Sequence, residues 1–204
     1  MKIHSVKFNF IMNFIMAASS IVFPLITFPY VSRVLMAAGN GKVATASAVI
    51  TYFNMFASLG IPTYGIRACA KVRDDRDKLS QTVQELLIIN SVTMLITCAA
   101  FVFTVALVPE FAAEKELYVI NGIGMVLNMF AITWLYNALE QYAYITVCNL
   151  LVKLVSLVLM LLMVKSPDDY ILYGGITVFA SSASYVFNFV YALRFISFKK
   201  KGPY

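Results

Sequence analysis

Six long apolar stretches, separated by short polar segments, dominate the chain. They cover approximately residues 8–32, 42–66, 82–108, 117–139, 142–164 and 170–193. A helix needs ~20 mainly apolar residues to cross the ~30 Å hydrocarbon core of a bilayer, and each stretch approaches or exceeds that length. The shorter, strictly alternating pattern of membrane β-strands is missing. The sequence therefore predicts an all-α, polytopic membrane protein whose six transmembrane helices form one bundle.

Composition and charge support this interpretation. The 204 residues are 61% hydrophobic and 13% charged, whereas soluble domains carry about 25% charged residues. Six spans place both termini on one side of the membrane. Eleven of the 16 lysines and arginines fall on that side and four on the other, so the positive-inside rule puts both termini in the cytoplasm. Because membrane orientation explains the net charge of +6, we expect no nucleic-acid partner.

Lys153 is the main candidate for chemistry. It lies eleven positions from either end of the 142–164 stretch, near the bilayer midplane. A cation there costs about 2.5–3.5 kcal/mol on insertion scales and usually faces a water-filled cavity or a partner. Polar residues recur on the same helical face at spacings of three, four and three: Thr146, Asn149, Lys153 and Ser156. The pattern favours Lys153 and Asn149 as cavity residues. The alternative is a buried structural pairing, with Glu140 as partner only if a helix bends.

The first stretch carries a second polar face, which consists of Asn9, Asn13, Ser20, Pro24 and Thr27. Pro24 and Pro29 each remove a backbone donor and should bend or loosen the outer half of the helix. Such prolines often mark membrane segments that line a pathway. We therefore predict a bending helix, in which Asn9 and Asn13 face either a cavity or a neighbouring helix.

The second stretch ends in the sequence GIPTYGIR, residues 60–67. Two glycines around Pro62 predict a flexible exit. Arg67 is expected at the cytoplasmic mouth, where its guanidinium could meet a phosphate, although an ordinary positive-inside anchor is the alternative. Small residues and Asn54 earlier in the stretch predict close helix packing.

No catalytic or metal-binding set is evident in the sequence. The paired carboxylates Asp74-Asp75 and Asp168-Asp169 have none of the histidine, serine or metal-ligand neighbours that a hydrolase or transferase needs. One histidine, His4, and three scattered cysteines form no plausible metal site. We expect neither an enzyme nor a cofactor.

Several segments, taken in order, resemble the start of polysaccharide-biosynthesis flippases. They are SVKFNFIMNFIMAASSIVFPLITFPYVSRVL, GNGKV, FASLGIPTYGIRACAKVRDD, TWLYNALEQYAYIT and DDYILYGGITVFASSASYVFNF. These flippases are the O-antigen and capsule repeat-unit transporters of the multidrug/oligosaccharidyl-lipid/polysaccharide exporter superfamily. The resemblance covers essentially the whole chain. One departure is Met36, which stands where the family usually has a glycine after SRVL, at the tight turn that follows the first helix.

The resemblance implies two bundles of six helices around a cationic cavity. Such proteins move undecaprenyl-diphosphate-linked oligosaccharide across the bacterial cytoplasmic membrane, while the polyprenyl tail stays in membrane lipid. These 204 residues hold one bundle, so we expect an N-terminal lobe whose second lobe is missing or supplied by another copy in trans. The expected cavity residues are Lys153, Asn149, Asn9, Asn13, Arg67 and Arg33. The expected hinge or kink positions are Pro24, Pro29 and Pro62.

Two other functions stay open. A multidrug or cation antiporter of the same superfamily usually needs an acidic site, whereas the mid-membrane charge here is positive. An inactive fragment or self-associating membrane subunit would bind no lipid-linked sugar.

Overall fold

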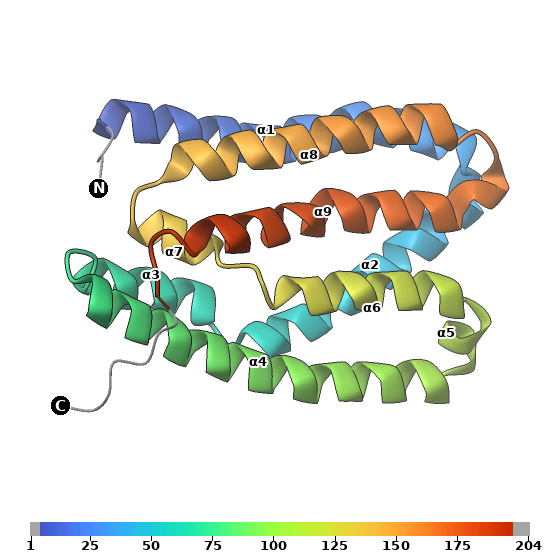
Figure 1. The fold of residues 1–204 in the computed structure, drawn as a ribbon. Coiled ribbons are helices and arrows are strands. Elements are labelled where there is room, and N and C mark those ends of the chain that lie inside the picture. Colours follow the sequence, from blue (N-terminus) through green and yellow to red (C-terminus); the bar gives the residue numbers. More distant parts are fainter. Residues whose placement is uncertain (1–4, 198–204) are drawn as a thin grey trace.

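The computed structural model describes residues 5–197, which form helices joined by short turns, with no β-strand among them (Figure 1). Six helical segments are long and apolar enough to cross a membrane: Val6–Val34, Met36–Lys71, Arg76–Leu107, Lys115–Ala138, Tyr142–Met163 and Pro167–Ala192. The predicted all-α architecture with six spans is confirmed. His4, and the lysines Lys2 and Lys199–Lys201 that contributed to the charge count, lie outside the described residues.

The helices of the described chain follow one another in a compact up-and-down arrangement (Figure 1). In order, they are α1 (Val6–Val34), α2 (Met36–Ser58), α3 (Ile61–Lys71), α4 (Arg76–Leu107), α5 (Pro109–Ala113), α6 (Lys115–Asn128), α7 (Thr133–Ala138), α8 (Tyr142–Met163), the 3-10 turn η1 (Pro167–Asp169) and α9 (Tyr170–Ala192). α9 packs against both α8 and α6, α1 packs on α8, and α2 packs on α4 and α6. α1 begins and α9 ends at the same end of the bundle.

Two of the predicted helices are each broken into two pieces. The helix predicted over 42–66 begins earlier, at Met36, and stops at Ser58; the chain then passes through Leu59 and Gly60, which are both left-handed, with φ of 42° and 74°. Pro62 lies in the first turn of α3, where a missing N–H leaves no helical bond unmade. The helix predicted over 117–139 is interrupted between α6 and α7.

Side chains of α4 donate hydrogen bonds to backbone carbonyls at both breaks. Thr93 Oγ1 donates to the Ala57 carbonyl near the end of α2, at 2.7 Å. Asn90 Nδ2 donates to the Met129 carbonyl just beyond α6, at 3.3 Å. An interrupted helix is tolerated at membrane depth only where the protein itself satisfies the freed backbone groups. Both breaks therefore depend on polar side chains of one neighbouring span.

The turn between α1 and α2 is very tight, because α1 ends at Val34 and α2 begins at Met36. Met36 has a φ of 55°, in the left-handed region that favours glycine, and its side chain is exposed. The expected tight turn therefore forms without the glycine, at the cost of a strained residue.

At the same end of the bundle, a polar cluster links the segment before α6 to α2 and α9. Glu114, which precedes α6, lies 2.5 Å from Lys42 Nζ of α2. It also accepts a hydrogen bond from the Tyr170 hydroxyl of α9, at 2.8 Å. The hydrogen bond from Lys42 holds the pKa of Glu114 below its ordinary value.

We expect Met36→Gly to raise the thermal stability of the detergent-solubilised protein. A left-handed residue with a Cβ costs roughly 1–2 kcal/mol, part of which is offset by the greater freedom of glycine in the unfolded chain. A net gain of about 1 kcal/mol would raise Tm by ~2–4 °C in a chain of this size. Ala37→Gly, one residue further along, is the control and should lower Tm. A Tm for Met36→Gly at or below wild type would contradict the strain.

The Glu114 cluster predicts a pH dependence that Glu114→Gln should remove. Because the folded-state pKa is lowered, the carboxylate stabilises the fold above its ordinary pKa, and this contribution disappears as pH falls through the folded-state pKa. The Tm difference between wild type and Glu114→Gln should therefore be largest near neutral pH and shrink below about pH 4. Glu110→Gln, an exposed acid four residues earlier, is the matched control. A difference that does not change with pH would show that the ion pair is not the cause.

Candidate functional site

Lys153 of α8 is half-buried against α1. Its Nζ donates to Ser19 Oγ at 3.0 Å and to Ser20 Oγ at 3.1 Å, and it lies 5.8 Å from the centre of the Phe23 ring. Within residues 5–197, no carboxylate forms an ion pair with it. Glu140, considered above as a partner, instead pairs with Arg73 at 3.0 Å. An ammonium has three donors, so one donor and the full charge remain for a ligand.

The polar face of α8 is directed toward α1, as its spacing predicts. Thr146 Oγ1 donates to the Met12 carbonyl at 3.1 Å, and Asn149 Nδ2 lies 3.7 Å from the Met16 sulfur. These contacts place Asn149 in the helix–helix contact beside Lys153. Asn149 does not line the cavity that lies beside Lys153.

A cavity of about 410 Å³ lies beside Lys153, between α1, α8 and α9. We call it the Lys153 pocket. Ser20, Pro24 and Thr27 of the polar face predicted for the first helix line it, whereas Asn9 and Asn13 of that face do not. The residues with polar side chains in its wall are Ser20, Thr27, Lys153, Ser156, Tyr173, Thr177 and Ser181.

A second cavity, of about 440 Å³, lies between α2, α6 and α9. We call it the amide pocket, because Asn54, Asn121 and Asn128 line it. Asn128 Nδ2 donates to Asn54 Oδ1 at 3.1 Å. Other polar lining residues are Ser47, Thr51, Thr177, Ser181, Ser182 and Tyr185. Thr177 and Ser181 of α9 line both pockets, so the two are neighbours.

The remaining predicted cavity residues are not brought to Lys153. Asn9 is buried, and its Oδ1 has no hydrogen-bond partner among the described residues, whereas Asn13 is exposed. Arg33, in the last turn of α1, and Arg67, in α3, are exposed at opposite ends of the bundle (Figure 1).

The two prolines of α1 do not interrupt it. Pro24 and Pro29 both lie inside the continuous helix Val6–Val34. The Thr27 hydroxyl approaches the Pro24 carbonyl at 3.4 Å. A bending role for these prolines stays a prediction.

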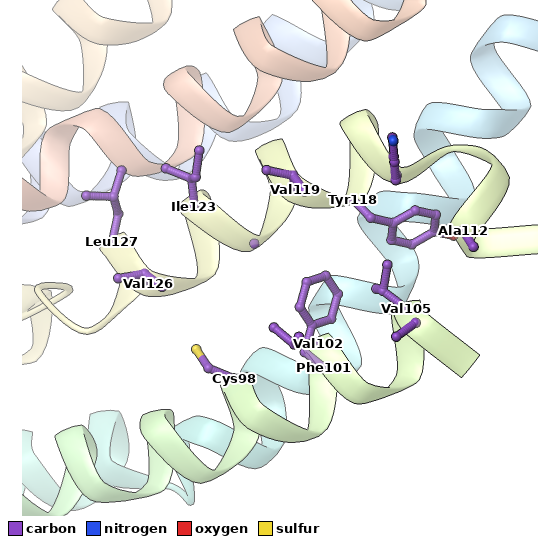
Figure 2. A pocket seen from close by; sticks show the side chains of 13 residues that line it. Cys98, Phe101, Val102, Val105, Ala112, Tyr118, Val119, Ile123, Val126 and Leu127 are labelled. Carbon is purple, nitrogen blue, oxygen red and sulfur yellow. The ribbon is translucent and has the colours of Figure 1, made fainter. Parts of the chain in front are cut away.

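A third cavity, of about 650 Å³, has a different character (Figure 2). Figure 2 shows side chains of α4 and α6, among them Phe101, Val105, Ile123 and Val126, around an almost wholly apolar space. Val102 and Val119 of its wall are exposed on the apolar surface. Such a surface suits a hydrocarbon chain rather than a polar solute.

Comparison with known proteins places the chain in a family. A family model described as "Polysaccharide biosynthesis protein" matches residues 6–203. The chain belongs to this family. A protein of Escherichia coli (strain K12) named "Putative O-antigen transporter" is 25% identical over 172 residues, which cover 84% of this chain and 41% of that protein. A protein of the same name from Shigella dysenteriae is 24% identical over 165 residues, which cover 81% and 41%.

The chain thus spans about two fifths of the length of these curated relatives. No solved structure matches it.

For this member of the polysaccharide biosynthesis family, reasoning from sequence missed two parts of the site. Ser19 was not predicted as a site residue, although it is buried and contacts Lys153 directly. The amide pocket also escaped notice, and Asn54 was assigned only to packing. A signal was present: Ser47, Thr51 and Asn54 follow helical spacing, as do Asn121, Gly124 and Asn128.

Proposed function

We propose that this chain forms one lobe of a flippase that moves polyprenyl-diphosphate-linked oligosaccharide repeat units across the bacterial cytoplasmic membrane. Both termini would lie in the cytoplasm. The observation that carries the proposal is Lys153, a mid-helix cation bound by two neutral hydroxyls at the wall of a cavity that is otherwise lined by hydroxyl and apolar side chains. Family membership and the printed names of the two relatives support a role in transport.

The chemistry of such a ligand matches the three cavities. A diphosphate is anionic and accepts hydrogen bonds, so it would take the free donor and charge of Lys153. Attached sugars need neutral hydrogen-bonding groups, which the neighbouring polar surface offers. A polyprenyl tail is apolar and stays in lipid or against the apolar cavity between α4 and α6. A second lobe, or another copy in trans, would close the cavity and rock against this lobe during alternating access.

Two alternatives receive less support. A cation antiporter would need a negative charge in its cavity, yet within the described part of the chain no aspartate or glutamate lines the Lys153 pocket or the amide pocket. An enzyme would need a nucleophile–base or acid–base set. The residues that line these two pockets include no histidine, cysteine or carboxylate. We therefore propose a transporter without catalytic activity.

Removal of the Lys153 charge is the direct test. Lys153→Met should reduce glycan export at least tenfold in cells whose surface polysaccharide depends on this protein. The reason is that a hydrogen bond to a charged group contributes about 1.5–3 kcal/mol. Export is measured as surface glycan per unit of membrane-inserted protein. Lys165→Met, in the turn before η1, is the matched control and should export normally.

Lys153→Arg separates charge from shape. It keeps the cation on a longer, planar group, and should retain part of the export. Wild-type export by Lys153→Met, at an equal protein level, would overturn the assignment of Lys153.

A further inference from the structure

We infer that the amide pocket is the sugar-binding subsite of this lobe, and that the ligand divides chemically between the two neighbouring pockets. The amide pocket takes neutral, hydroxyl-rich sugar, while Lys153 takes the diphosphate. The inference rests on the proposed function and assigns the second half of its ligand.

The lining of the amide pocket selects for hydrogen bonding without charge. Three carboxamides and several hydroxyls line it, and none of its described lining residues is charged. A carboxamide offers both donors and acceptors, as sugar hydroxyls require. The bond from Asn128 Nδ2 to Asn54 Oδ1 uses one donor and one acceptor. This bond leaves the side-chain nitrogen of Asn54 and the side-chain oxygen of Asn128 with capacity for a ligand.

The two helix breaks give the amide pocket a polarity opposite to that of Lys153. Asn54 lies in the last turns of α2, and Asn128 is the last residue of α6. The carbonyl end of a helix carries a partial negative charge of roughly half an electron. Two such ends favour hydroxyl donors and disfavour phosphate. The anionic part of a ligand is therefore directed to Lys153, and the sugar hydroxyls to the amide pocket.

The size of the amide pocket indicates a binding site rather than a contact in which polar side chains only pack helices together. Its volume of about 440 Å³ falls within the ~300–1,000 Å³ of small-molecule sites and far exceeds the space that a bare metal ion needs. Behind it, α6 and α9 are in close contact, because a Cβ at Gly124 would lie 2.7 Å from Val178 Cγ1. The cavity is thus open while its back wall is tightly packed.

One ligand can reach both pockets, since Thr177 and Ser181 border each of them. The hydroxyl of Ser181 bonds within its own helix, to the Thr177 carbonyl at 3.1 Å. It therefore presents a neutral polar surface between the two sites. A diphosphate bound at Lys153 would place its first sugar over this surface.

The test compares two probes on the protein reconstituted in lipid nanodiscs. One probe is undecaprenyl diphosphate, and the other is the same lipid carrying a neutral disaccharide; the dissociation constant of each is measured by native mass spectrometry. Wild type should bind the glycosylated probe about tenfold more tightly. Asn54→Leu should lose most of this preference while its affinity for the bare lipid stays unchanged. Gln81→Leu, an exposed amide at the start of α4, is the matched control and should keep the full preference.

A milder variant keeps the test decisive if Asn54→Leu fails to fold. Thr51 is exposed and bonds only to the Ser47 carbonyl of its own helix among the described residues, so Thr51→Val should fold and reduce the preference about threefold. An unchanged preference in the folded variants overturns the sugar subsite, as does an equal loss of affinity for both probes. Equal binding of both probes by wild type also overturns it while leaving the flippase proposal intact. Failure of wild type to bind either probe would instead overturn the proposed function.

Discussion

Every backbone carbonyl at membrane depth needs a donor from within the protein, because hydrocarbon offers none. This requirement governs where α2 and α6 can end. Thr93 and Asn90 of α4 supply the donors, to the carbonyls of Ala57 and Met129. Beyond the breaks, the short helices α3 and α7 pack together so closely that a Cβ at Gly65 would lie 2.7 Å from the Trp134 ring. The breaks fix the ends of α2 and α6, and with them the amide pocket.

The hydroxyls of the spans meet the same requirement in a different way from the Lys153 ammonium. Most hydroxyls in the spans bond to a carbonyl three or four residues earlier in their own helix, as Ser156 does to Val152 at 2.8 Å. They are satisfied locally and need no partner helix. The Lys153 ammonium bonds instead to a neighbouring helix, because it reaches across to α1 and binds Ser19 and Ser20.

The sequence predicted what depends on period and length, and missed what depends on neighbours. Six spans and the polar face of α8 follow from spacing alone, and the Lys153 contacts with α1 agree with that face. Around Gly60 and Pro62 the sequence predicted a flexible exit from the helix, and the structure has the first break at this place. The second break, at 129–132, contains no glycine or proline, and its carbonyl is satisfied by a side chain 39 positions away in sequence. Arg33 and Arg67 looked like cavity cations, because sequence does not give the depth of a helix end within the bundle.

Under the proposed function, a single lysine would suit a site that must release its ligand better than a cluster of arginines would. Transport requires a site that attracts the solute but lets it leave. A bidentate guanidinium cluster would hold a diphosphate strongly, whereas Lys153 offers one point charge. In the empty lobe, Ser19 and Ser20 bind the half-buried ammonium, so two of its three donors would stay satisfied after ligand release. In the proposed transport cycle, the serines would thus reduce the energy difference between the loaded and empty lobe and keep both states accessible.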